Sequence, residues 1–321
     1  MTPEKSILIG IDIGGTNVRA GAVTAQGELL NWRDAKIEAD RGPDFGLNVI
    51  VDLVENVVTE AGLSVAALGI GSTGPLDRER GCIQNPYTLP GWEDVDIVTP
   101  LRERFGVPVA LENDADAASL GEAWVGAGRG FKSMVMFTIG TGVGFALIKD
   151  GEIHRGVNGE HPEGGHILID PEGPECYCGT NGCLESLVAG PALAAFARSA
   201  AQENPGSYLS GVPGAPENLE ARDIFEGARM GDGVCLELVD QTAGYIARGL
   251  ISILMMILPE AIVLTGGVLR SFDLMEKRIR LELKKVDIII PAGNVHLQMS
   301  KTGQHAGLLG AARAAQLLLE K

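Results

Sequence analysis

The pattern of apolar and polar residues in the first third of the chain predicts alternating strands and helices. Short apolar runs rich in β-branched residues predict three strands, at residues 7–13, 18–23 and 29–37. Apolar residues at helical spacing then predict a helix over 44–61, closed by Gly62. A strand, a helix and a strand are expected next, at residues 67–71, 96–105 and 107–112. These elements form one α/β unit.

A second succession of the same kind begins at residue 134. Residues 134–139 and 143–148 predict two strands joined by Gly140-Thr141-Gly142, as Gly14-Gly15-Thr16 joins the first two. Such an internal repeat predicts two similar lobes that face each other across a cleft.

The remainder is predicted to be mostly helical around one late strand. The expected helices cover residues 234–258, 274–285 and 305–320, and the strand covers 261–264. The stretch 204–219 is rich in Pro, Gly and Ser and predicts a surface loop.

Length and charge narrow the class of protein. A chain of 321 residues is long for one core, so two domains are expected. The formal net charge of −16 argues against partners that need basic surfaces, namely nucleic acid and anionic membrane. The first residues lack the features of a signal peptide, and the apolar stretch 249–259 is about half a membrane span. A soluble cytoplasmic protein is expected.

Cysteines are concentrated in one segment. Cys176, Cys178 and Cys183 fall within eight residues, with His166 upstream, and three thiolates plus one imidazole match a closed tetrahedral Zn2+ site. A disulfide or scattered thiols remain the alternative, although Cys-x-Cys pairs close poorly into a disulfide. A four-ligand metal would be structural, and the chemistry would then belong to the neighbouring carboxylates Glu163 and Glu185.

Three glycine turns, each after a predicted buried strand, could hold phosphates through their backbone N–H groups. They are Gly14-Gly15-Thr16, Gly140-Thr141-Gly142 and Thr265-Gly266-Gly267. The alternative is that these glycines only make turns. No Gly-Lys-Ser/Thr motif occurs, which excludes a P-loop, and the sequence after Gly69–Gly74 does not predict the helix that a dinucleotide site needs.

Asp114 lies where a predicted strand ends and the helix 115–125 begins. It could cap that helix, or it could act as a general base at the carboxyl end of a strand, beside the amide of Asn113. The pattern alone leaves both roles open.

Four motifs together resemble the ROK family of bacterial sugar kinases: IGIDIGGTNVRAGAV, LENDADAASLGEA, TIGTGVG and EGGH followed by CYCGTNGCLE. The resemblance runs nearly the whole length of the chain. It implies an α/β, two-lobed actin-like ATPase (ribonuclease H-like) fold with duplicated βββαβα units and a central cleft. The small lobe would comprise residues 1–114 plus roughly 305–321. The large lobe would comprise 115–304, with the zinc-binding loop at 166–183.

The resemblance also implies site residues and cofactors, ATP, Mg2+ and Zn2+. Asp114 would be the base that takes the proton from a sugar hydroxyl. The sugar would be held by Gly74, Asn113, Asp114, Glu163, His166 and Glu185. ATP would be held by Asp12, Gly14, Gly15, Thr16, Thr141, Gly142, Gly266 and Gly267. Zinc would be held by His166, Cys176, Cys178 and Cys183.

The expected substrate is glucose, phosphorylated at its 6-hydroxyl. N-acetylmannosamine or N-acetylglucosamine is the second choice, followed by fructose or mannose. A non-catalytic sugar-binding regulator is the alternative class. Some family members are DNA-binding repressors with a preceding helix-turn-helix domain, for which the start of the chain before Asp12 leaves no room. The resemblance further implies a homodimer.

Overall fold

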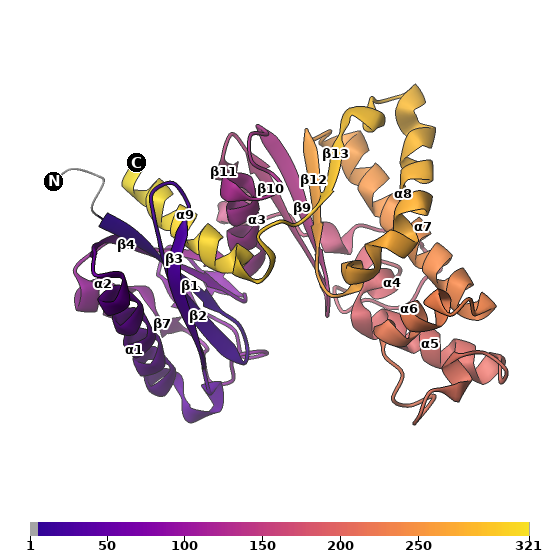
Figure 1. Ribbon diagram of the computed structural model, residues 1–321, viewed down its shortest axis with the longest axis horizontal. Coiled ribbons are helices and arrows are strands. Elements are labelled where there is room, and N and C mark those ends of the chain that lie inside the picture. Colours follow the sequence, from indigo (N-terminus) through magenta and orange to yellow (C-terminus); the bar gives the residue numbers. More distant parts are fainter. Residues whose placement is uncertain (1–5, 321) are drawn as a thin grey trace. The chain divides into compact units, whose positions relative to one another are not determined.

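The strands predicted near the N-terminus form a five-stranded sheet in the order β3-β2-β1-β4-β8. The computed structural model describes residues 6–320 (Figure 1). The sheet consists of β1 (Ser6–Ile13), β2 (Asn17–Val23), β3 (Leu29–Lys36), β4 (Ser64–Ser72) and β8 (Val109–Asn113). Strands β1, β4 and β8 are parallel, so their carboxyl ends lie side by side.

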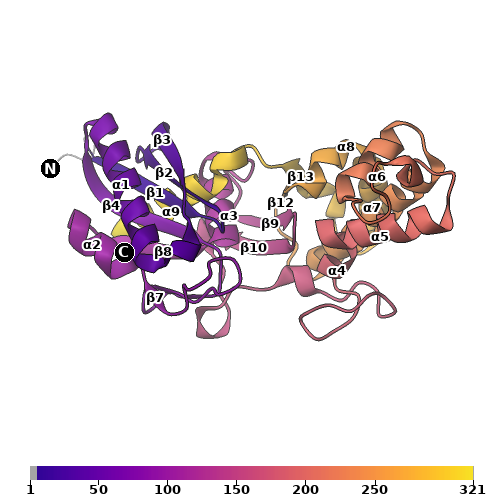
Figure 2. The ribbon, with the colours of Figure 1, turned by 90° about the horizontal axis from the view of Figure 1, so that it is seen from below.

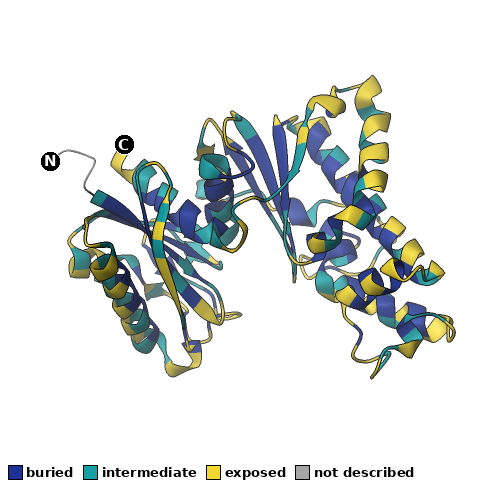
Figure 3. Cartoon of the chain, in the orientation of Figure 1, coloured by how far each residue is buried: buried dark blue, intermediate teal, exposed yellow. Residues whose placement is uncertain are grey.

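Helices cover both faces of this sheet, because successive apolar side chains of β1 point to opposite faces. Ile7, Ile9, Ile11 and Ile13 pack into a core with α1 (Pro43–Ala61) and α2 (Val98–Phe105). Leu8 packs on the other face with α9 (Ala306–Glu320), which also contacts α3 (Asp114–Val125). Figures 2 and 3 show the helices around this sheet and their buried inner faces.

A second five-stranded sheet has the order β11-β10-β9-β12-β13, which repeats the first sheet strand for strand. Its strands are β9 (Ser133–Ile139), β10 (Val143–Lys149), β11 (Glu152–Ile153), β12 (Ala261–Thr265) and β13 (His296–Met299). Strands β9 and β1 hold the same central place in their sheets. The duplication predicted from the glycine turns is therefore confirmed.

The expectation of one late strand was wrong, because β13 pairs in parallel with β12. Its four residues, His-Leu-Gln-Met, are too few and too polar to produce an apolar pattern, and pairing with β12 makes them a strand. Two antiparallel strand pairings at residues 76–96 were also not predicted. They form a small sheet of β5 (Leu76–Asp77), β6 (Cys82–Ile83) and β7 (Val95–Asp96).

The remaining helices lie between β11 and β13 in the chain and pack mainly on one another. They are α4 (Leu184–Val188), α5 (Gly190–Glu203), α6 (Ala221–Arg229), α7 (Gly233–Met256) and α8 (Phe272–Lys285). No helix within residues 6–320 is long and apolar enough to cross a membrane.

The chain divides into two compact units. Unit 1 comprises the described residues up to Lys132, Leu147–Arg155 and the residues from Ser300 on. Unit 2 comprises Ser133–Ala146 and Gly156–Met299. The predicted boundary between the two lobes, after Asp114, stays a prediction.

Glu122 fixes the point at which the chain re-enters unit 1. Its buried carboxylate accepts hydrogen bonds from the backbone N–H groups of Ala127, Lys301 and Thr302 and from the hydroxyl of Ser300. Burial raises the pKa of Glu122, but the hydrogen bonds from Ser300 and Thr302 outweigh burial and bring the pKa below its ordinary value. The ionised carboxylate therefore holds the end of α3 against residues 300–302.

Candidate active site

The carboxyl edge of the first sheet gathers the predicted site residues of unit 1. Asp12 pairs in register with Gly71, and Ser72 pairs with Asn113. The ends of β1, β4 and β8 are therefore neighbours, and the residues that follow them extend from one edge. This edge is where ligands bind in open α/β sheets.

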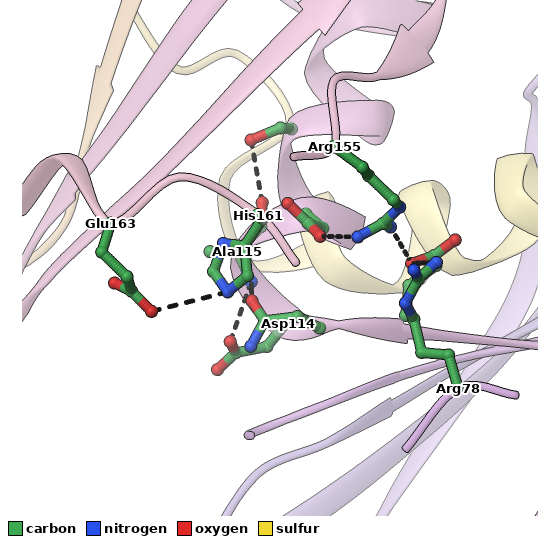
Figure 4. Close-up of polar contacts among 10 residues, drawn as sticks. Arg78, Asp114, Ala115, Arg155, His161 and Glu163 are labelled. Atoms are coloured by element: carbon green, nitrogen blue, oxygen red, sulfur yellow. Dashed lines mark hydrogen bonds and ion pairs between the residues drawn. The ribbon is translucent and has the colours of Figure 1, made fainter. Parts of the chain in front are cut away.

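Asn113 and Asp114 have different positions at the start of α3. Asn113 is the N-cap, and its Oδ1 accepts a hydrogen bond from the Ala115 N–H at 2.8 Å. Asp114 is the first helical residue, and its Oδ1 also accepts from the Ala115 N–H at 2.8 Å (Figure 4). Because Asn113 already caps the helix, the carboxylate of Asp114 is not required for that purpose.

The loop after β4 is held in place by Asn85. This buried amide donates to the carbonyl oxygen of Thr73 at 3.3 Å and to the hydroxyls of Thr73 and Thr88 at 3.0 and 2.6 Å. Gly74 follows directly and lies against the side-chain amide of Asn113. The predicted sugar-contacting glycine is thus fixed beside the predicted sugar-binding amide.

Asp12 is half-buried near the first glycine turn. Its Oδ2 lies 3.2 Å from Nη1 of Arg19. Burial raises the pKa of Asp12 above its ordinary value, although the charge of Arg19 opposes this effect. Gly15 and Thr16 in the turn itself are exposed.

A network of buried charges flanks Asp114 (Figure 4). Arg155 places Nη1 3.0 Å from Oδ2 of the fully buried Asp116 and places Nη2 against Oε2 of Glu112. Arg78 approaches the same Glu112 oxygen at 3.6 Å. Burial raises the pKa of Glu112, and the two arginines act against this. The two carboxylates that flank Asn113 and Asp114 in the chain are therefore both held by Arg155.

Unit 2 brings two of the glycine turns together. Strands β9 and β12 are parallel, so Thr141 and Gly142 after β9 lie near Gly266 and Gly267 after β12. Gly266 has φ of 108°, and a Cβ there would lie 2.2 Å from the carbonyl oxygen of Ile139. Only glycine fits this turn.

Glu185 links the same turns to the predicted sugar ligands. Its Oε2 accepts a hydrogen bond from the Val143 N–H at 2.7 Å, directly after Gly142. Gly164 and Gly165 pack against Phe145 and Val143 so closely that a Cβ would lie 2.4 and 2.2 Å from their atoms. This contact places Glu163 and His166 at the ends of a tight segment on β10. Glu163 itself is exposed, with Oε1 3.7 Å from Nε2 of His161 (Figure 4).

The four predicted metal ligands form one cluster. Ligand atoms of His166, Cys176, Cys178 and Cys183 all lie within 4.8 Å of one another. Nδ1 of His166 is 3.4 Å from Sγ of Cys176, and Sγ of Cys178 is 3.4 Å from Sγ of Cys183. A tetrahedral zinc site with bonds of about 2.3 Å to sulfur separates its sulfurs by about 3.8 Å. The donor set and its spacing therefore fit Zn2+, and all five cysteines are free of disulfides.

Hydrogen bonds around the cluster orient the thiols. The Thr180 hydroxyl lies 3.0 Å from Sγ of Cys183 and 3.4 Å from Sγ of Cys178. The Cys176 N–H donates to the Thr180 carbonyl, which closes the Cys-x-Cys turn. Such outer contacts are characteristic of structural metal sites.

Tyr177 contacts the second nitrogen of His166, Nε2, with its hydroxyl at 3.1 Å. Partial desolvation of the hydroxyl, together with the negative charge of Glu185, raises the pKa of the Tyr177 phenol to about 12. The phenol thus stays protonated at neutral pH.

Sequence reasoning found the strand ends and the cluster of His166 and three cysteines but missed five supporting residues: Arg78, Asn85, Glu112, Asp116 and Arg155. Each of these five has a partner 12 to 43 residues away in the chain, which the sequence does not show. Tyr177 was also missed, although its position between two metal ligands marks it as part of the loop.

The two sheets with the same strand order, each carrying glycine turns at its carboxyl edge, define an α/β protein of the actin-like ATPase fold. The profile of the ROK family matches residues 8–317. This match covers most of the chain, and the chain belongs to the ROK family.

Similar proteins agree with this assignment. A glucokinase from Thermotoga maritima is 34% identical over 312 residues, which are 96% of each chain. The crystal structure of a ROK hexokinase from Thermus thermophilus has a TM-score of 0.83 at 33% identity and covers 98% of this chain and 99% of that one. The structure of a ROK glucokinase from Streptomyces griseus, in complex with glucose and AMPPNP, has a TM-score of 0.75 at 31% identity. It covers 97% of this chain and 100% of that one.

Proposed function

We propose that the chain is an ATP-dependent hexose kinase that phosphorylates the 6-hydroxyl of glucose. The observation that carries the proposal is the carboxyl edge of the first sheet, where Asp12, Gly74, Asn113 and Asp114 are neighbours at the ends of β1, β4 and β8. The glucokinases among the similar proteins support this substrate.

In the proposed reaction, Asp114 accepts the proton of the sugar hydroxyl while its oxygen attacks the γ-phosphorus of ATP. The bond between that phosphorus and the β–γ bridging oxygen breaks, and ADP leaves. Asn113, Glu163, His166 and Glu185 orient the sugar, because carboxylates and amides hydrogen-bond several hydroxyls. Such transfer depends on positioning and electrostatics.

The turns after β1, β9 and β12 hold the nucleotide in this proposal. Thr16 and Thr141 add hydroxyl donors to the backbone N–H groups of Gly15, Gly142, Gly266 and Gly267. Gly14 shapes the first turn, because its N–H donates to the Asn17 carbonyl at 2.9 Å. Mg2+ bound with ATP neutralises charge on the phosphates. The half-buried Asp12 suits such a cation, because burial disfavours its charge unless a positive charge is near.

Zinc supplies no chemistry in this proposal and only orders the loop. With Nδ1 of His166 toward the metal, Nε2 carries the proton and faces outward as a donor.

A panel of sugars tests the proposed function. Purified protein with ATP, Mg2+ and glucose is expected to release ADP, with higher kcat/KM for glucose than for N-acetylmannosamine, N-acetylglucosamine, fructose or mannose. NMR of the product should locate the phosphate on the 6-oxygen. A sugar-dependent rise in melting temperature without ADP release for any sugar would instead identify a non-catalytic sugar-binding regulator.

Metal content tests the zinc site. Protein prepared without chelator is expected to contain about one zinc per chain by elemental analysis, because four ligands saturate a structural site. Cys178→Ser should lose the metal, whereas Cys82→Ser, which removes a thiol outside the cluster, should keep it. Zinc well below one per chain in the unmodified protein would contradict the assignment.

A further inference from the structure

Tyr177 is the exposed aromatic residue of the loop 166–183, and it contacts His166 in two ways. Its side chain is 84% exposed, yet its hydroxyl lies 3.1 Å from Nε2 of His166. The two rings also meet edge to face, with centroids 5.1 Å apart and an interplanar angle of 89°. An exposed tyrosine held by both contacts has a defined place over His166.

The direction of the hydrogen bond between Tyr177 and Nε2 of His166 follows from what the other ring nitrogen, Nδ1, contacts. Nδ1 of His166 faces Sγ of Cys176 at 3.4 Å, where the cluster would bind its metal. A metal on Nδ1 leaves the proton on Nε2, so Nε2 donates and the Tyr177 oxygen accepts. The phenolic O–H is then directed away from Nε2.

A sugar hydroxyl has the same hydrogen-bonding capacity as this phenol. It accepts a hydrogen bond from an N–H donor and donates its own proton to a carboxylate. His166 and Glu185 are the donor and the acceptor that the proposed function assigns to the sugar. The Tyr177 hydroxyl thus occupies the donor of His166 as a hexose hydroxyl would.

We propose that Tyr177 is an affinity-determining residue whose hydroxyl occupies the sugar-hydroxyl position on Nε2 of His166 in the sugar-free enzyme and is displaced by the bound sugar. The inference rests on the proposed function and adds a residue to its sugar site. By keeping Nε2 of His166 paired, Tyr177 makes every sugar compete with an internal hydroxyl.

Tyr177→Phe tests this competition, because it removes the hydroxyl and keeps the ring. We expect KM and Kd for glucose to fall about 3- to 10-fold, the equivalent of one neutral hydrogen bond, with kcat little changed. The ratio of kcat/KM for glucose to that for mannose should change little, since both sugars displace the same hydroxyl. The measurements are steady-state kinetics with both sugars and calorimetric titration with glucose.

Tyr208→Phe is the matched control, because its hydroxyl also donates to a carboxylate, that of Glu226, at 3.3 Å. It should leave KM and Kd unchanged. A rise in KM for Tyr177→Phe would mean that Tyr177 binds the sugar directly, and equal values would mean that it has no role. Loss of zinc from the variant would assign Tyr177 to the metal loop alone. Each of these results overturns only this inference, whereas absence of sugar binding in both proteins overturns the proposed function with it.

Discussion

Asp114→Asn is expected to lower kcat for glucose phosphorylation by about 10²- to 10⁴-fold, the usual contribution of a general base. Asparagine keeps the shape of the side chain and an oxygen that can accept from the Ala115 N–H, as Asp114 does at 2.8 Å. It cannot accept the proton of the sugar hydroxyl. Binding of glucose should change little, because the amide still hydrogen-bonds a hydroxyl.

The rate constant kcat is measured from ADP release in a coupled assay. The Kd for glucose is measured by calorimetric titration. Asp44→Asn is the matched control, since Asp44 lies in the first turn of α1 as Asp114 lies in that of α3, and it is exposed. The control removes the same charge from a helix N-terminus and should retain full activity. A full rate in Asp114→Asn would reject Asp114 as the base.

Arg155→Met is expected to lower the free energy of unfolding by about 3–5 kcal/mol, the range for breaking a buried ion pair by removing one partner. Arg155 is 18% exposed, and its guanidinium lies 3.0 Å from the carboxylate of Asp116, which is fully buried. Methionine fills much of the space but leaves that carboxylate without its guanidinium. Glu112 loses the nearer of its two arginines as well.

Urea denaturation monitored by circular dichroism gives the free energy of unfolding. Arg229→Met is the control, because Arg229 forms an ion pair with Asp273 at 2.7 Å on the surface, with both side chains about half exposed. Exposed pairs contribute about 0–1 kcal/mol, so the control should unfold near the unmodified protein. Equal losses in the two variants would show that the Arg155 network is no more stabilising than a surface pair.

Much of the fold could be predicted from the sequence because it depends on local patterns. Strands β1 and β9 are apolar runs that end at glycines, and α1 has apolar residues at helical spacing with Gly62 in the left-handed conformation at its end. Strand β13 could not be predicted, since its four residues become a strand only by pairing with β12. The strand order of the sheets likewise depends on contacts between distant segments.

The candidate site divides in the same way. The cysteine cluster could be predicted because Cys176, Cys178 and Cys183 lie within one short loop, where chain length alone keeps their thiols close. The pairing of Arg155 with its carboxylates could not be predicted, because any of the chain's 26 basic residues could have paired with Asp116. The contact of Tyr177 with His166 depends on the path of the loop between Cys176 and Cys178.

The sequence by itself determined the family, the cysteine cluster and the glycine turns, because each depends on residues close together in the chain. Tertiary structure alone decided which strand ends are neighbours, that Asn113 caps α3 beside Asp114, and that Arg155 neutralises the carboxylates on either side. Strand pairing and the desolvation of charges set these features. Both are properties of residues brought together from distant parts of the chain.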